Sequence, residues 1–219
     1  MNKNSMIATG SPQNDQTFRP IKPHISSKRQ GTSGKEKVES IPQIDLRQAV
    51  KLPEGEDLNE WLAKNVSDFY RQVSMLYSTI TEFCTDEHCP VMSAGPGYRY
   101  LWSEDQSGSH PAEVTAPQYI IYLLKWIDSL LENEEIFPST SNAPFPDDFI
   151  VYVKNCMKRL FRFYAHCYYH HLENFQALKM EKLLNTSFKH FIFFSYEFNL
   201  ISQDQLEPLR DYIELVLNS

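Results

Sequence analysis

One long amphipathic stretch restricts the folds that are open to this chain. Between residues 58 and 80 apolar side chains recur at steps of three and four residues, beginning with Leu58 and Trp61 and ending with Tyr77 and Ile80. This spacing places them on one side of an α-helix, which must bury that side against the rest of the protein. Residues 53–57 (PEGED) are typical of a turn followed by a helix N-cap. The pattern predicts a long helix that contributes to a helical core.

The same kind of periodicity predicts further helices at residues 116–133, 149–175, 184–198 and 203–217. Residues 84–114 break the helical period with several glycines and prolines. Within them, residues 98–102 alternate like a short strand, and a second short strand near residues 112–115 would complete a small β-hairpin insert. No repeat of fixed period is present. We expect an all-α domain with a small hairpin insert.

The first 45 residues differ in composition from the rest. They are rich in Ser, Thr, Gln, Asn, Pro and Lys and carry seven bases against four acids, a net charge of +3. Residues 46–219 carry fourteen bases against twenty-four acids, a net charge of −10. The contrast predicts a flexible basic arm over residues 1–45 and a helical domain over residues 46–219. The overall charge of −7 argues against a general nucleic-acid binder.

Targeting signals and disulfides are not indicated. No apolar run approaches the roughly 18–20 residues that a membrane span needs, and the N-terminus lacks the apolar core of a secretory signal. Four cysteines are too few for a disulfide scaffold in a chain of 219 residues. We expect a cytoplasmic or nuclear protein.

Two cysteines and two histidines have spacings that suit a metal site. Cys84 and Cys89 are separated by four residues, as are His166 and His171. Two cysteines with two histidines form a common structural zinc set, and four protein ligands would close the site to catalysis. His170 faces the side of His166 better on a regular helix, and His88 could compete within the cysteine loop. Spacing alone also allows four unrelated core residues.

A basic cluster lies on the helix predicted at residues 149–175. Lys154, Lys158 and Arg162 are four residues apart and share a face, with Arg159 beside them. Arginine side chains bind phosphate oxygens with two parallel hydrogen bonds, so a phosphorylated peptide is a natural ligand. A salt-bridged, solvated helix face is the alternative.

The first long helix carries an acidic row. Glu56, Glu60 and Asp68 lie on its polar side, interrupted by Lys64. Such a row is either a solvated face or a docking surface for a basic partner. No enzyme signature accompanies it, because the chain has no phosphate-binding glycine loop, no G-x-S-x-G and no H-E-x-x-H. We expect no catalytic activity.

Several longer stretches resemble a known family. They are residues 52–61 (LPEGEDLNEW), 77–84 (YSTITEFC), 89–96 (CPVMSAGP), 158–166 (KRLFRFYAH) and 184–194 (LNTSFKHFIFF). Together they are similar to the MOB (Mps one binder, phocein-like) kinase-activator family, in the branch that partners NDR and LATS kinases. The resemblance covers about residues 46–217. It implies an all-α core around a four-helix bundle, a structural zinc and no catalytic activity of its own.

The resemblance also implies roles for individual positions. The family's zinc ligands fall on Cys84, Cys89, His166 and His171, which selects His171 over His170. Its kinase-docking surface falls on Glu56, Glu60, Trp61 and Asp68, and its phosphopeptide pocket on Lys158, Arg159 and Arg162. Its regulatory phosphorylation sites fall on Thr17 and Ser40. Residues 21–45 depart from the family pattern, so switching through Ser40 is the least supported of these roles.

The resemblance implies a non-catalytic coactivator and adaptor. Such a protein binds the basic N-terminal regulatory segment of NDR/LATS-type Ser/Thr kinases and accepts phosphopeptides from an upstream Ste-type kinase or scaffold, in Hippo-type or mitotic-exit signalling and cytokinesis. The alternative is a scaffold subunit of a larger kinase–phosphatase assembly, in which phosphate binding is incidental.

Overall fold

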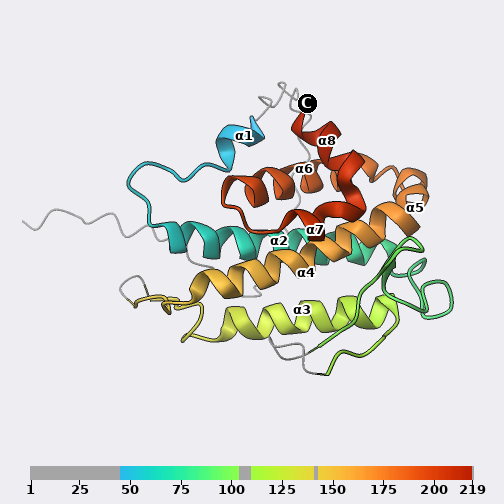
Figure 1. Cartoon of the computed structure of the whole chain (residues 1–219), viewed down its shortest axis with the longest axis horizontal. Coiled ribbons are helices and arrows are strands. Elements are labelled where there is room, and N and C mark those ends of the chain that lie inside the picture. The colour runs from blue at the N-terminus through green and yellow to red at the C-terminus, as the bar shows by residue number, and fades with distance from the viewer. Residues whose placement is uncertain (1–44, 104–109, 141–142, 219) are drawn as a thin grey trace, which may run out of the picture.

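The computed structural model describes residues 45–103, 110–140 and 143–218 (Figure 1). The predicted flexible arm, with the candidate phosphorylation sites Thr17 and Ser40, lies outside the described residues except for Asp45.

The described chain is mostly helical, which confirms the predicted fold class. The helices and strands are α1 (Leu46–Ala49), α2 (Leu58–Ile80), β1 (Ser93–Ala94), β2 (Tyr98–Arg99), α3 (Ala116–Glu132), α4 (Phe149–His170), α5 (Leu172–Ala177), α6 (Glu181–Glu197), α7 (Gln203–Leu206), a 3₁₀ turn (Glu207–Leu209) and α8 (Arg210–Leu217). None of the helices within the described ranges is long and apolar enough to cross a membrane.

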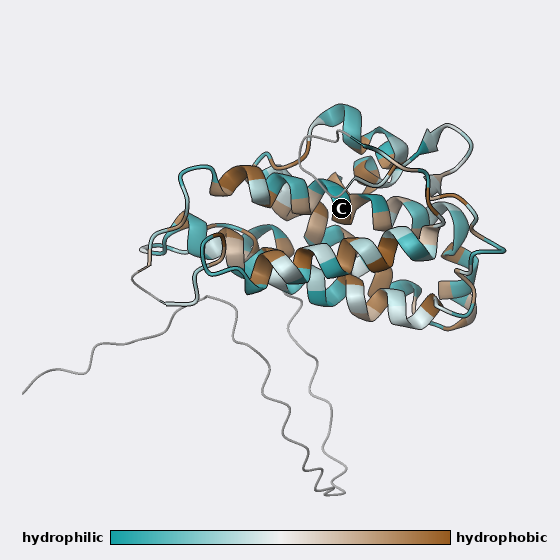
Figure 2. Cartoon of the chain, turned by 90° about the horizontal axis from the view of Figure 1, so that it is seen from below, coloured by the Kyte–Doolittle hydropathy of each residue, from teal (hydrophilic) through white to brown (hydrophobic). Residues whose placement is uncertain are grey.

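Four long helices form the core. α2 packs against α3, α4 and α6, and α4 also contacts α3. In Figure 1, α4 crosses in front of α2 with α3 below it and α6 above. Aromatic rings fill the centre, where the Phe191 ring lies 5.2 Å from Phe69 and 5.0 Å from Tyr164. Figure 2 shows apolar and polar residues alternating along the helices, as expected when each helix buries one side.

Helix α2 begins where the sequence predicts. The Asp57 carboxylate accepts hydrogen bonds from the backbone N–H groups of Asn59 (2.9 Å) and Glu60 (3.1 Å). Gly55 in the preceding turn has φ +84°, a left-handed conformation that glycine adopts without strain. The turn and cap place Glu56 and Glu60 at the beginning of α2.

The hairpin differs from the prediction. β2 pairs with β1 across Gly95-Pro96-Gly97, with Ser93 opposite Arg99, and not with residues 112–115. The expected second strand is reduced to one isolated bridge between Trp102 and Ala112. The reason is the short turn, since Gly95 at φ +68° reverses the chain directly after β1.

Two predicted helices are each divided. The helix predicted over residues 149–175 ends at His170, and α5 starts at Leu172. His171 between them has φ −130° and ψ 6°, outside the helical region. The last predicted helix is split by the 3₁₀ turn at Pro208, whose ring nitrogen has no hydrogen to donate to a helix.

Candidate functional site

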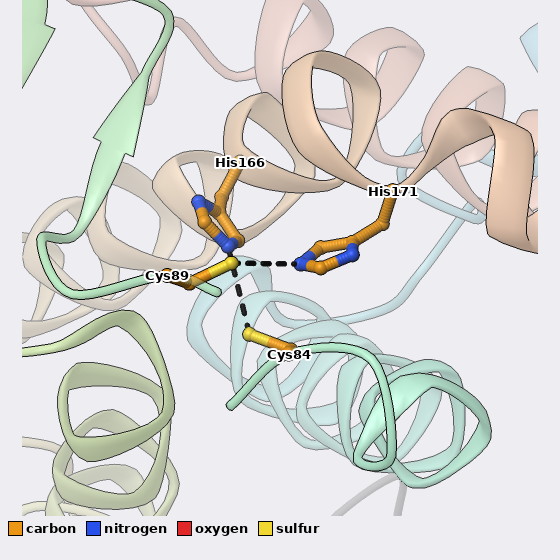
Figure 3. A group of neighbouring side chains, drawn as sticks. All are labelled: Cys84, Cys89, His166 and His171. Atoms are coloured by element: carbon orange, nitrogen blue, oxygen red, sulfur yellow. Dashed lines mark hydrogen bonds between the residues drawn. The ribbon is translucent and has the colours of Figure 1, made fainter. Parts of the chain in front are cut away.

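The four predicted metal ligands converge at one end of the bundle (Figure 3). Cys84 follows α2, Cys89 lies in the next loop, His166 is on α4, and His171 stands between α4 and α5. All four side chains are buried, and their ligand atoms lie within 4.8 Å of one another. Residues 82 positions apart in the sequence therefore meet: Cys84 with His166, and Cys89 with His171.

The distances suit a tetrahedral ion. The Sγ atom of Cys84 lies 3.6 Å from Nε2 of His166, and that of Cys89 lies 3.4 Å from Nε2 of His171. A tetrahedral zinc with usual Zn–S and Zn–N bonds separates a sulfur from a nitrogen ligand by about 3.5 Å. The residues present therefore fit a metal ion without rearrangement of these two pairs.

In both histidines of the cluster, the ring nitrogen Nδ1 has a hydrogen-bond partner outside the cluster. Nδ1 of His166 lies 2.9 Å from the carbonyl oxygen of Ser93, and Nδ1 of His171 lies 3.1 Å from Oδ1 of Asn174. Oxygen acceptors require Nδ1 to carry the proton, which leaves the Nε2 lone pair directed into the cluster. Sequence reasoning missed both partners. The three-residue step from His171 to Asn174 was a usable signal, whereas Ser93 is brought in only by the hairpin.

Burial determines the protonation of the cluster. It lowers the pKa of His166 to about 3, and it also lowers the pKa of His171, so both rings are neutral near pH 7. Burial raises the pKa of the Cys84 and Cys89 thiols. The site without metal is therefore uncharged, and a metal ion would take the place of the thiol protons.

The competing histidines lie outside the cluster. His170 is exposed, and its Nε2 lies 3.1 Å from Oγ of Ser93. His88 is exposed and contacts the Thr85 hydroxyl at 2.8 Å through Nδ1. The end of α4 explains this outcome, because the non-helical backbone at His171 turns its ring toward the cysteines.

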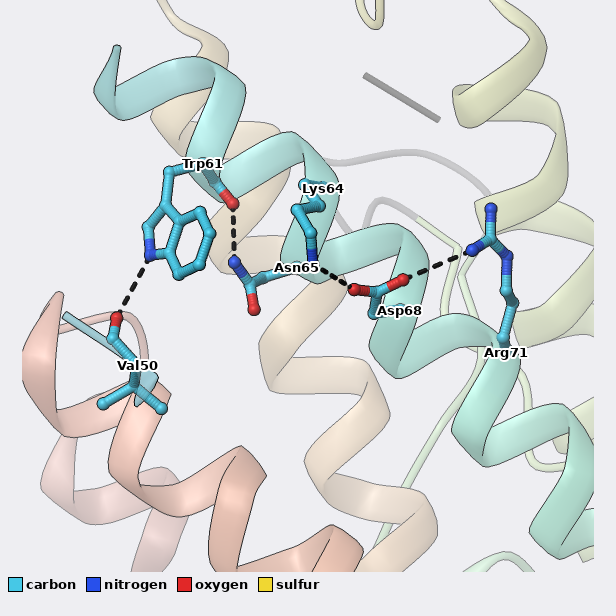
Figure 4. A network of polar contacts seen from close by, with 6 residues as sticks. All are labelled: Val50, Trp61, Lys64, Asn65, Asp68 and Arg71. Carbon is cyan, nitrogen blue, oxygen red and sulfur yellow. Dashed lines mark hydrogen bonds and ion pairs between the residues drawn. The ribbon is translucent and has the colours of Figure 1, made fainter. Parts of the chain in front are cut away.

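The acidic row runs from the turn before α2 into its first three turns, and its last member, Asp68, is neutralised by neighbouring cations (Figure 4). Glu56 and Glu60 are half-buried at the helix start. The Asp68 carboxylate forms ion pairs with Lys64 at 2.6 Å and with Arg71 at 3.3 Å. The surface that a partner would meet is therefore less acidic than the sequence indicates.

Trp61 lies mostly beneath this face. It is only 8% exposed, and its indole N–H donates to the carbonyl oxygen of Val50 at 3.1 Å (Figure 4). The Lys64 ammonium lies 5.4 Å from the centre of its ring. Trp61 therefore joins the α1 region to α2 and supports the acidic face from below.

The two arginines of the basic cluster on α4, Arg159 and Arg162, are packed among aromatic side chains, a region that we call the aromatic pocket. Arg159 is 9% exposed, and its guanidinium stacks between Trp102 (4.6 Å) and Trp126 (4.3 Å). It donates to the carbonyl oxygen of Ser103 at 2.9 Å. This rigid placement differs from a solvated, salt-bridged helix face.

Several polar atoms gather beside Arg159. Arg162 donates to the Tyr119 hydroxyl at 2.9 Å and lies 5.1 Å from the Tyr100 ring centre. Nε of Arg162, Nε1 of Trp102 and the Tyr100 hydroxyl are buried without a hydrogen-bond partner among the described residues. Buried polar atoms of this kind normally have a partner, and a ligand could reach these three only if the surrounding side chains moved. The alternating aromatics of residues 98–102 were the sequence signal for this wall, although they indicated only a strand.

Lys158 lies between this pocket and the segment that follows α6. It is half-buried and lines a hollow with residues 199–202. Burial lowers the pKa of Lys158, and the positive charges of Arg162 and Arg159 lower it further. Lys158 therefore lies close to two further positive charges on α4.

The sequence is similar to known proteins of one family. Residues 38–209 match the model of the Mob1/phocein family. Arabidopsis thaliana proteins named MOB kinase activator-like 1A and 1B are 46% identical over 213 residues and 48% identical over 216 residues, and each alignment covers 97% of this chain and 99% of the relative. A Dictyostelium discoideum protein named MOB kinase activator-like 1 homolog B is 45% identical over 205 residues, covering 94% of this chain and 95% of the relative.

Proposed function

The chain belongs to the Mob1/phocein family, and we propose that it is a non-catalytic coactivator of NDR/LATS-type Ser/Thr kinases. The observation that carries this proposal is the near full-length similarity to proteins named MOB kinase activators. It would bind the basic regulatory segment that precedes the kinase domain, and would act in the cytoplasm or nucleus.

The start of α2 supports a basic partner. Glu56 and Glu60 lie together beside the helix N-terminus, and the Asp57 cap holds the first turn in place. Acidic side chains on a rigid helix attract a basic segment and accelerate its encounter. Trp61 would contribute by keeping α2 in position through its bond to Val50.

The aromatic pocket on α4 supports binding of a phosphopeptide from an upstream Ste-type kinase or scaffold. Its cationic side chains are Lys158, Arg159 and Arg162. A phosphothreonine brings nearly two negative charges and three acceptor oxygens. The phosphate would accept from the ammonium group of Lys158 and the guanidinium of Arg162, whose side chains are only half-buried.

The cysteine–histidine cluster supports a structural zinc. Cys84, Cys89, His166 and His171 would hold it, and zinc would supply a fixed four-coordinate junction between the end of α2 and the end of α4. Ser93 and Asn174 hold the two rings in the orientation that this needs.

The kinase-binding proposal is tested by charge reversal. Glu56→Lys/Glu60→Lys should weaken binding of an NDR/LATS N-terminal segment at least about tenfold in a fluorescence-anisotropy titration, because both attractive charges become repulsive. Glu173→Lys on α5 is the matched control and should bind like wild type. Wild type and both variants must have equal melting temperatures, so that a loss of binding cannot come from unfolding. Undiminished binding by the double variant would refute the assignment.

A further inference from the structure

A second basic hollow adjoins the phosphopeptide pocket. It has a volume of about 280 Å³ and lies between α4 and the segment that leads from α6 to α7. Figure 1 shows this segment running along α4 on the side opposite α3. The polar residues that line it are Lys154, Asn155, Lys158, Asn199, Ser202 and Gln205.

The lining is suited to an anion. It combines two ammonium groups with amide and hydroxyl groups, and no carboxylate contributes to it. Within the described ranges neither Lys154 nor Lys158 forms an ion pair. The nearby Asp204 carboxylate is outside the hollow and accepts from Gln205 at 3.2 Å. An unpaired lysine pair contrasts with residues 46–219, whose net charge is −10.

The hollow and the aromatic pocket are lined by neighbouring residues of the same helix, α4. Lys154, Lys158 and Arg162 follow one another at steps of four along α4, so Lys154 and Arg162 are about 12 Å apart along the helix axis. An extended peptide covers that distance in about four residues. Lys158 lines the hollow and is electrostatically coupled to Arg159 and Arg162. A ligand that occupies both places would therefore pass over Lys158, from Arg162 on the α3 side of α4 to Lys154 in the hollow.

Electrostatics favours a second negative charge. Burial and the two neighbouring arginines lower the pKa of Lys158, which means that its positive charge is disfavoured in the free protein. A single phosphate carries at most two charges against three crowded cations and Lys154 beyond them. A further anionic group would relieve the remaining repulsion.

We propose that this hollow is a second anion subsite, which binds a carboxylate or a second phosphate three or four residues from the phosphothreonine of the same peptide. The inference rests on the proposed phosphopeptide function and names the kind of ligand: an acidic or doubly phosphorylated segment. Lys154 would be the residue specific to this subsite, with Ser202 and Gln205 beside it.

The test uses a peptide series and full-length protein in isothermal titration calorimetry at about 0.15 M salt. The reference peptide carries one phosphothreonine between neutral residues, and an unphosphorylated copy accompanies it. Two further peptides place paired aspartates three and four residues before or after the phosphothreonine. A last pair replaces the aspartates by one phosphoserine, which separates a carboxylate from a phosphate as the second group.

We expect one of the two placements to bind wild type at least about fivefold more tightly than the reference peptide. Lys154→Gln should abolish this gain while binding the reference peptide like wild type. Lys182→Gln, an exposed lysine on α6, is the matched control and should retain the gain.

The outcomes separate the two proposals. If wild type binds the phosphorylated and unphosphorylated reference peptides equally, the phosphopeptide function fails and the subsite fails with it. If the phosphate is preferred and Arg162→Gln removes that preference, the phosphopeptide function stands. In that case the subsite is overturned if the second charge gives no gain at either placement, if the gain survives in Lys154→Gln, or if Lys182→Gln loses it equally.

Discussion

Asp68 illustrates how neighbouring side chains set the charge that a partner meets. Its carboxylate is held by Lys64 on one side and Arg71 on the other, one of them at 2.6 Å. These pairs are partly exposed, so their contribution to stability is small. Their effect on binding is larger, because Lys64 places a positive charge between Glu60 and Asp68 on the surface proposed to receive a basic segment.

Removing that charge should strengthen kinase binding. Lys64→Gln frees one side of the Asp68 carboxylate and removes a repulsive group, so we expect about twofold to fivefold higher affinity for the basic segment. The gain should shrink as salt is raised. A titration at two ionic strengths measures both effects, with Lys125→Gln on α3 as the control. Unchanged or lower affinity of Lys64→Gln would contradict the role given to this face.

The two adjacent histidines at the end of α4 should differ in metal binding. Purified protein should contain about one zinc per chain, and His171→Ala should lose most of it because one of four ligands disappears. His170→Ala should keep the metal, since that ring lies against Ser93 and outside the cluster. Elemental analysis of both variants checks this. Equal metal content in the two variants would exclude His171 as a ligand.

Helices were predictable from the sequence where one local pattern determined them. The apolar period and the Asp57 cap define α2, and the same period defines α3. The break after His170 was not predictable, because the apolar pattern continues through Leu172 and Phe175 and only the tertiary contacts of His171 interrupt it. The burial of Trp61 agrees with its place in the apolar stripe of residues 58–80, whereas its hydrogen bond to Val50 could not be read from that local pattern.

The hairpin depends on Gly95, and two glycines allow a matched test. A Cβ atom on Gly95 would lie 2.7 Å from the Tyr169 ring, whereas one on Gly55 would meet nothing within 4 Å. Both residues have positive φ, so Gly55→Ala should cost about 1 kcal/mol from backbone strain alone. Gly95→Ala should cost more, because Tyr169 must also move. Urea unfolding of both variants measures the difference, and equal losses would show that the ring moves freely.

At the scale of the whole molecule, the cysteine–histidine cluster lies far from the proposed kinase surface and close to the proposed phosphate pocket. Cys84 follows the C-terminal end of α2, whereas Glu56 and Glu60 lie at its start, about 35 Å away along a helix of 23 residues. Arg162 is only one turn from the ligand His166 on α4. The cluster also holds the hairpin, because the carbonyl oxygen of Ser93 in β1 is bonded to His166. β2 leads directly into Tyr100 and Trp102 of the proposed phosphate pocket.

Loss of the metal should therefore affect the two surfaces unequally. Cys89→Ser removes a ligand without a direct contact to either proposed partner, and it should lower the melting temperature because structural zinc contributes to folding. Below that melting temperature, phosphopeptide affinity should fall several-fold, since the ends of α4 and the hairpin are no longer fixed to one another. Affinity for the basic kinase segment should stay within about twofold of wild type.

Cys156→Ser, which changes a buried thiol of α4 outside the cluster, is the control for a general loss of packing. Equal weakening of both interactions in Cys89→Ser, or the same pattern in Cys156→Ser, would show that the metal stabilises the bundle as a unit and gives the phosphate pocket no special support.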